Sequence, residues 1–113
     1  MLTSGDVVDL DLGSPKGREA GLRRPVVVVT AQEILDESAN VVQVVPLSST
    51  IRPFGSEVQI AADEHNGLGF DSAAQCQHIR SVSVGRVESV RGNVGASTLS
   101  EIREVLALVL DIR

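Results

Sequence analysis

The chain has 113 residues and is 42% hydrophobic, with no Trp or Tyr and only two Phe. This length predicts a single domain over residues 1–113, and the lone Cys76, the missing leader and the absence of a long apolar run indicate a soluble cytoplasmic protein. The net charge of −5 argues against a general nucleic-acid coat, although basic residues gathered between Ser14 and Pro53 leave a local cationic cleft open.

The first half of the chain predicts short strands. Apolar and acidic residues alternate within residues 5–12, which is typical of a half-buried strand with one wet face. A loop then leads to a strand from Pro25 to Thr30, buried enough to hold four consecutive valines. One helical turn is expected within Gln32–Ser38, followed by strands over Val41–Leu47 and Glu57–Ile60.

The second half predicts two more strands and one helix. A turn cluster over residues 63–69 precedes strands at Ser72–Ile79 and Ser81–Val87. Apolar residues then recur at helical spacing from Leu99 to Leu110, with Ser97 or Thr98 as the expected N-cap. Several short strands followed by one helix predict a mainly β fold, a small β-barrel closed by a C-terminal helix.

No standard metal or cofactor motif is present. His65 and His78 lie thirteen residues apart with Cys76 beside only one of them, which matches no zinc spacing. The phosphate-loop and dinucleotide fingerprints are missing, and no Ser-His-Asp order stands out. We therefore expect neither a metal nor a cofactor.

The most informative feature is the pair Arg23-Arg24 immediately before Pro25. It places a guanidinium at a rigid strand edge, where its planar fork suits a phosphate group. The run Ser48-Ser49-Thr50 ends another predicted strand, although such runs are also common in ordinary strand-ending turns. From the local sequence alone, a phosphate site and a solvated charged turn remain equally open.

Two glutamines complete this set of polar residues at strand ends. In a strand over Ser72–Ile79, Gln75 and Gln77 share one face, and Cys76 and His78 lie on the other. Buried amides need hydrogen-bond partners, so these glutamines favour an exposed functional face or a dimer interface. Amides, hydroxyls and a cation together suit the reading of bases and the binding of phosphate.

Four segments of the chain, in this order, resemble the MazF/PemK/Kid-type toxins of bacterial toxin–antitoxin modules. Gly5-Asp6-Val7-Val8-Asp9-Leu10-Asp11-Leu12 resembles the family's opening strand. Lys16-Gly17-Arg18-Glu19 followed by Arg24-Pro25-Val26-Val27-Val28 is similar to its Gly-x-Glu loop and Arg-Pro strand. Val45-Pro46-Leu47-Ser48-Ser49 and Gln77-His78-Ile79-Arg80-Ser81-Val82 resemble two further signature segments.

The resemblance implies an SH3-like β-barrel of the CcdB/PemK type with a C-terminal helix, assembled as a homodimer. It also implies the toxin of a type II toxin–antitoxin system, a metal-independent endoribonuclease that cuts single-stranded mRNA at short sequences and arrests growth. Attack by the ribose 2′-hydroxyl would leave a 2′,3′-cyclic phosphate and a 5′-hydroxyl. A cognate antitoxin protein would neutralise it.

Site residues follow from the same resemblance, position by position. Arg24 falls on the catalytic arginine and Ser48 on the active-site hydroxyl, and Glu19, the one carboxylate of the signature loop, is the candidate base. The expected RNA-binding residues are Lys16, Arg18, Ser49, Arg52, Gln75, Gln77 and His78. His78 is not expected to carry protons, because a strand places it opposite Gln77.

Departures from the family pattern keep other functions open. Asp9 replaces an aromatic residue, and Gln75 and Gln77 stand where some members have a catalytic Arg and Asp, so these amides can only contact the RNA. The alternatives are a toxin of the same fold that binds a protein such as DNA gyrase, an SH3-type peptide-binding module, and a catalytically inactive relative. Since only Phe54 and Phe70 can stack on bases, we expect hydrogen-bond readout and cleavage at a defined short motif.

Overall fold

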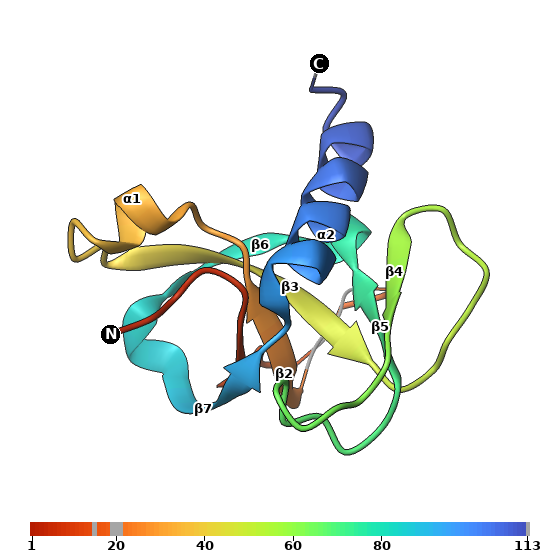
Figure 1. Cartoon of the computed structure of the whole chain (residues 1–113), viewed down its shortest axis with the longest axis horizontal. Coiled ribbons are helices and arrows are strands. Elements are labelled where there is room, and N and C mark those ends of the chain that lie inside the picture. The colour runs from red at the N-terminus through yellow and green to blue at the C-terminus, as the bar shows by residue number, and fades with distance from the viewer. Residues whose placement is uncertain (15, 19–21, 113) are drawn as a thin grey trace.

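A twisted antiparallel sheet with one long helix packed on it forms the molecule (Figure 1), which confirms the predicted mainly β fold with a C-terminal helix. The computed structural model describes residues 1–14, 16–18 and 22–112. In chain order, its elements are β1 (Asp6–Asp11), β2 (Arg23–Val28), α1 (Gln32–Leu35), β3 (Val41–Ser48), β4 (Glu57–Ile60), β5 (Ser72–Gln75), the 3₁₀ turn η1 (Cys76–His78), β6 (Arg80–Ser83), the 3₁₀ turn η2 (Val84–Arg86), β7 (Val87–Asn93) and α2 (Gly95–Val109).

Strand β3 organises the sheet, whose order is β4-β5-β3-β2-β1-β7 with β6 also paired to β3. The first half of β3 pairs with β6, whereas its last residues, Leu47 and Ser48, pair with β5. Strand β2 runs antiparallel along β3, with Val26 opposite Pro46. The end of β3 is therefore the point where β2 and β5 converge, and Ser48 lies there.

The central strands bury both of their faces. Alternate residues such as Val7, Val27 and Val45 belong to a core cluster that includes Leu99 and Ile102 of α2. The residues between them belong to a second cluster, which includes Val8, Leu10, Val26, Val28, Val42 and Val44. Since burial of each such side chain contributes about 1.5–3 kcal/mol, this two-sided core explains why β2 carries consecutive valines. The predicted buried strand at Pro25–Thr30 is confirmed, although it begins two residues earlier.

The alternation predicted for the first strand is confirmed from Val8 onward. Val8 and Leu10 of β1 are fully buried, whereas Asp9 is partly exposed and Asp11 is exposed. Val7, which precedes the alternation, is also buried: it faces the α2 cluster, while Val8 and Leu10 face the other cluster.

Two later strands differ from their predicted bounds. The predicted strand at Ser72–Ile79 stops at Gln75, because residues 76–78 form the 3₁₀ turn η1. The predicted strand at Ser81–Val87 likewise ends at Ser83, and the edge strand β7 that follows was not predicted at all. Strand β7 is mostly exposed and polar, so it lacks the apolar alternation that marks a strand in sequence.

The predicted N-cap of the C-terminal helix is also wrong. Helix α2 begins at Gly95, and Ser97 and Thr98 lie within its first turn without capping it. Instead, the Asn93 side-chain oxygen accepts a hydrogen bond from the Gly95 amide at 2.7 Å. Gly95 has φ +86°, a conformation that glycine adopts without steric cost. The predicted buried stripe is confirmed at Leu99, Ile102 and Leu106, whereas Val109 and Leu110 are exposed.

Candidate active site

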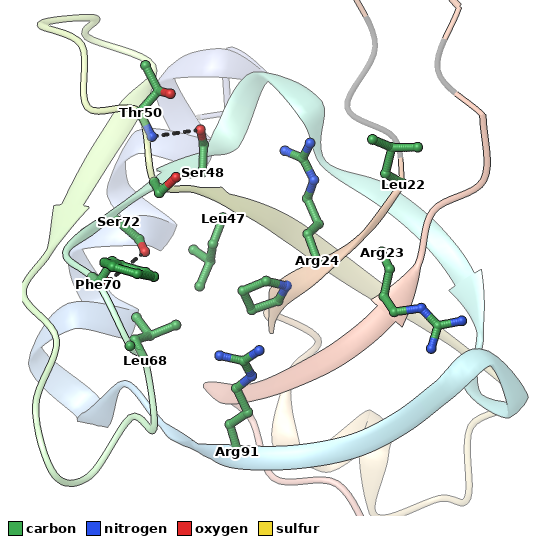
Figure 2. A pocket seen from close by; sticks show the side chains of 13 residues that line it. Leu22, Arg23, Arg24, Leu47, Ser48, Thr50, Leu68, Phe70, Ser72 and Arg91 are labelled. Atoms are coloured by element: carbon green, nitrogen blue, oxygen red, sulfur yellow. Dashed lines mark hydrogen bonds between the residues drawn. The ribbon is translucent and has the colours of Figure 1, made fainter.

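Arg24 and Ser48 come from the neighbouring antiparallel strands β2 and β3. The ladder between these strands pairs Val26 with Pro46, and Arg24 and Ser48 lie just beyond that pair, each two residues further along its own strand. Both residues line the same two surface cavities, and Figure 2 shows their side chains among those that surround the first one. The topology thus brings together two residues that are 24 positions apart in sequence.

Local structure fixes each of these side chains. Arg24 is half-buried in β2, opposite Leu10 of β1, and the ring of Pro25 fixes the backbone that follows it. The Ser48 hydroxyl oxygen accepts a hydrogen bond from the Thr50 amide at 3.1 Å, which closes the turn after β3. Because the oxygen accepts this bond, the hydroxyl hydrogen can donate to an anionic ligand.

Three adjoining cavities form what we call the basic groove. The first cavity, lined by Arg24, Ser48 and Thr50, shares these residues with the second. The second shares Gln77 and His78 with the third. The basic residues along the groove are Arg23 and Arg91 at one end, Arg24, Arg18 and Arg52 in the middle, and Lys16 and Arg80 at the other end.

Positive charge is concentrated in this groove. It holds seven of the chain's ten Lys and Arg residues. No carboxylate occurs among the described residues that line its three cavities. Although the protein is acidic overall, this groove therefore offers a basic surface to a polyanion. The sequence analysis left such a local cationic cleft open.

The structure corrects the predicted arrangement of Gln75, Gln77 and His78. Because η1 replaces the end of the predicted strand, Gln75 and Gln77 do not share one exposed face: Gln75 is only 7% exposed, whereas Gln77 is exposed. His78 lies on the same side as Gln77, since both line the second and third cavities. The reason for discounting His78 as a proton carrier is therefore wrong.

The other predicted RNA-binding residues are distributed along the groove. Ser49 lines the first cavity, Arg18 and Arg52 line the second, and Lys16 lines the third. Glu19, the candidate base, lies outside the residues that the structure describes.

Three residues outside the predicted catalytic and RNA-binding sets also belong to this region, and one of them, Phe70, was already expected as a ring that could stack on bases. Arg91 lines the first cavity from β7, and it was missed because β7 was not predicted. Phe70 lines the same cavity and is 75% exposed, a position suited to base stacking. The third is Glu57, whose side chain is fully buried and hydrogen-bonded to Arg52 and Gln77.

Two groups near the groove have shifted acidities. A hydrogen bond from the Arg91 guanidinium, with Nε 2.9 Å from the carboxylate, lowers the pKa of Asp9. Burial raises the pKa of the Cys76 thiol to about 11, and the negative charge of Glu57 adds to this effect. Cys76 is therefore a protonated core residue at neutral pH and not a nucleophile.

Within residues 1–14, 16–18 and 22–112, no three His, Cys, Asp or Glu side chains gather closely enough to hold a metal ion. No helix in those ranges is both long and apolar enough to cross a membrane.

Comparison with known proteins places the chain among one group of toxins. Residues 3–110 match the family model described as the PemK-like, MazF-like toxin of type II toxin–antitoxin systems. Endoribonuclease MazF9 of Mycobacterium tuberculosis is 32% identical over 117 residues, covering 99% of this chain and 98% of that protein. The structure of MazF from Deinococcus radiodurans superposes with a TM-score of 0.81 at 25% identity, covering 96% of each chain. A mycobacterial endoribonuclease in complex with its cognate antitoxin gives the same TM-score at 19% identity, covering 100% of this chain and 98% of that one.

Proposed function

We propose that this chain, which belongs to the PemK-like, MazF-like toxins of type II toxin–antitoxin systems, is an endoribonuclease that cuts single-stranded mRNA at a defined short sequence without a metal ion. The position of Arg24 and Ser48 in the same two cavities of the basic groove carries this proposal. Both core clusters draw on β1, β2 and β3, which supports one toxin domain over residues 1–113.

The groove supplies what RNA cleavage by the ribose 2′-hydroxyl requires. The 2′-oxygen attacks the adjacent phosphorus, the bond to the 5′-oxygen breaks, and the products are a 2′,3′-cyclic phosphate and a 5′-hydroxyl. In the transition state, negative charge accumulates on the non-bridging phosphate oxygens. Arg24 would neutralise this charge with two guanidinium hydrogen bonds, and Ser48 would donate its hydroxyl hydrogen to a non-bridging oxygen.

One group must take the proton of the 2′-hydroxyl and another must protonate the leaving 5′-oxygen. Arg24 serves neither purpose well, since a guanidinium stays protonated up to a pH of about 12. Glu19 remains the proposed base. His78, which lines the second and third cavities, is the proposed proton donor, because an imidazole ring nitrogen can both donate and accept a proton.

The rest of the groove would hold the RNA strand on either side of the cleaved bond. Lys16, Arg18 and Arg52 would contact phosphates, and Ser49, Gln77 and His78 would contact sugars or bases. Gln75 is nearly buried, so its contribution would be limited to one edge of the second cavity. Phe54 and Phe70 are the exposed rings on which bases could stack.

Partners follow from the family. We propose that a cognate antitoxin protein blocks the groove, as the mycobacterial relative is itself seen with its antitoxin. We also propose that the toxin acts as a homodimer in the cytoplasm, where mRNA is translated. Light scattering on the purified protein checks the dimer, and a mass of one 11.9 kDa chain would contradict it.

Cleavage of a long unstructured RNA in EDTA, with mapping of the 5′ ends, tests the proposed activity. Discrete sites with 5′-hydroxyl ends are expected for the wild type, and a uniform smear would contradict a defined motif. Arg24→Ala should reduce the rate at least about 100-fold, the typical cost of one oxyanion contact, with an unchanged melting temperature. Arg86→Ala is the matched control, because Arg86 lies in η2, away from the groove cavities.

The outcome also separates the alternatives. Near-wild-type cutting by Arg24→Ala would remove the proposed mechanism. Failure of the wild type to cut any RNA would favour an inactive relative or a toxin that binds a protein target such as DNA gyrase.

A further inference from the structure

A buried carboxylate lies directly behind the groove. Glu57 belongs to β4, opposite Gln75 of β5, and its side chain is fully buried. One of its oxygens, Oε2, accepts hydrogen bonds from Arg52 Nη2 at 2.7 Å and from Gln77 Nε2 at 2.7 Å. Both donors line the second cavity of the groove. Glu57 thus holds two groove residues from the protein side.

Stability alone does not explain this arrangement. The second oxygen, Oε1, and Arg52 Nε are both buried without a hydrogen-bond partner among the described residues. Each unpaired buried polar atom costs free energy, and the ion pair is only half-buried, because the Arg52 side chain is 39% exposed, so it contributes little net stability. What Glu57 does provide is a fixed position for the side chains in front of it.

The carboxylate also determines which end of the Gln77 amide faces the groove. An ionised carboxylate only accepts hydrogen bonds, so the amide must turn its nitrogen toward Glu57. The carbonyl oxygen, on the other side of the amide, is then presented to the groove that Gln77 lines. Without a fixed partner, an amide can turn by half a rotation and present either end.

Arg52 is fixed beside it in the same way. Its guanidinium carbon lies 4.6 Å from the centre of the Phe54 ring, while Nη2 binds Glu57. A cation held both by a carboxylate and by an aromatic ring retains one orientation. The second cavity therefore has a fixed cation next to a fixed hydrogen-bond acceptor.

We propose that Glu57 is a positioning residue for sequence selection: it holds Gln77 as a hydrogen-bond acceptor, so that one position of the bound RNA must offer an amino group. The proposal for Glu57 depends on one part of the proposed function, namely that RNA binds in the groove. At C6 of the purines and C4 of the pyrimidines, adenine and cytosine carry an exocyclic amine, whereas guanine and uracil carry a carbonyl oxygen, and the proposed contact is with this position of the base. The expected preference at that position is thus for adenine or cytosine over guanine or uracil.

A binding selection separates this inference from the cleavage chemistry. The probe is a random-sequence pool of 2′-fluoro RNA, which lacks the hydroxyl nucleophile and is not cleaved. The wild type should enrich amino bases over keto bases at one position by about fivefold or more, as expected for one hydrogen bond. Glu57→Gln frees the amide to turn, and the enrichment should fall below about twofold.

A charge swap provides the rescue. In the double variant Glu57→Gln with Gln77→Glu, the new carboxylate at position 77 again offers only acceptors, so the enrichment should return. A purely structural role for Glu57 would not produce this recovery. Gln77→Leu should abolish the enrichment, and Gln59→Leu, a change at the exposed face of β4, should leave it intact.

Each outcome decides the question. Unchanged enrichment in Glu57→Gln, or no amino-base preference in the wild type, overturns the proposal. If Glu57→Gln does not fold by circular dichroism, the double variant and Gln77→Leu decide it instead, and retained enrichment in Gln77→Leu overturns it. If the wild type selects amino bases but cuts no RNA, the proposed cleavage fails while the role of Glu57 stands.

Discussion

The adjacent residues Arg23 and Arg24 have different surroundings although both belong to β2. Arg23 forms an exposed ion pair with Glu88 of β7, at 2.7 Å. Arg24 is less exposed and lies opposite the end of β3. A pair exposed to solvent contributes little and holds its side chains loosely, so Arg24 is the better placed of the two for positioning a phosphate.

Because of the buried Cys76 thiol, we expect the folded protein to lose stability at alkaline pH. The thiol's folded-state pKa of about 11 exceeds the ordinary thiol value of 9.0, so between these pH values the unfolded state loses the thiol proton first. Stability present below pH 9 should therefore fall as the pH rises toward 11. The chain has no Tyr and a single Lys, so few other groups titrate in this window.

Urea denaturation at pH 8, 9.5 and 10.5 measures this effect. Cys76→Ala should be less stable throughout, because it leaves a small cavity, but its stability should depend less on pH over this range. Equal pH dependence in both proteins would show that the thiol does not carry the effect.

At Gly92 the structure leaves no room for a side chain. A Cβ at this position of β7 would collide with the backbone of His65 and Asn66. Gly92→Ala should therefore destabilise the protein by about 1–3 kcal/mol, as overpacking typically does. Gly55→Ala is the control, since its Cβ would meet none of the described atoms within 4 Å. Thermal denaturation compares the two variants, and equal melting temperatures would show that position 92 has room for a methyl group.

At the scale of elements, the pairing of β7 with β1 brings one carboxylate and one guanidinium together. Arg91 Nε donates to both oxygens of Asp9, at 2.9 Å and 3.1 Å, and Ser89 donates at 2.8 Å. This pair also holds Arg91 at the end of the basic groove. Asp9 stands where the family usually has an aromatic residue, so an ionic contact occupies that position here.

The Asp9–Arg91 pair predicts a loss of stability in acid. Because the folded-state pKa of Asp9 is lowered, its contribution to stability is present above the ordinary aspartate value of 3.8 and is lost as the pH falls through the folded-state pKa. Asp9→Asn should cost at most about 1 kcal/mol at pH 7 and flatten the acid limb of the stability curve. Glu88→Gln, at the more exposed Arg23 pair, should change stability less. Urea denaturation between pH 3 and 7 tests both variants.

The turn η1 determines the arrangement of the groove more than any strand does. Its three residues end β5 and turn Gln77 and His78 toward the same cavities. The sequence of Ser72–Ile79 reads as one continuous strand, because no residue in it breaks the strand pattern. The strand ends at the point where Cys76 joins the core cluster of α2, a contact that the local sequence does not show. Cys76, buried against α2, anchors this turn in the core.

At the scale of the whole molecule, seven of the ten Lys and Arg residues line the basic groove, although Arg23, Arg52 and Arg91 also form ion pairs with carboxylates at its border. Binding of single-stranded RNA should weaken with salt, with a slope of about −0.7 in log K against log salt per phosphate contacted. Lys16→Gln should reduce the magnitude of this slope by about 0.7, because Lys16 lines the far end of the groove. Arg86→Gln, outside the groove cavities, should leave it unchanged. Fluorescence anisotropy between 50 and 300 mM salt, a range over which such contacts change markedly, measures both; equal slopes would contradict the proposed path.

The sequence by itself determined the mainly β fold, the C-terminal helix, the buried valine strand and the resemblance that selects Arg24 and Ser48. These depend on local periodicity and on short motifs, which remain visible without the fold. Only the tertiary structure revealed the edge strand β7 with Arg91, the turn that places His78 beside Gln77, and the buried Glu57. The reason is physical: an edge strand, a 3₁₀ turn and a buried carboxylate are each defined by partners distant in the chain, and local sequence patterns carry no record of those partners.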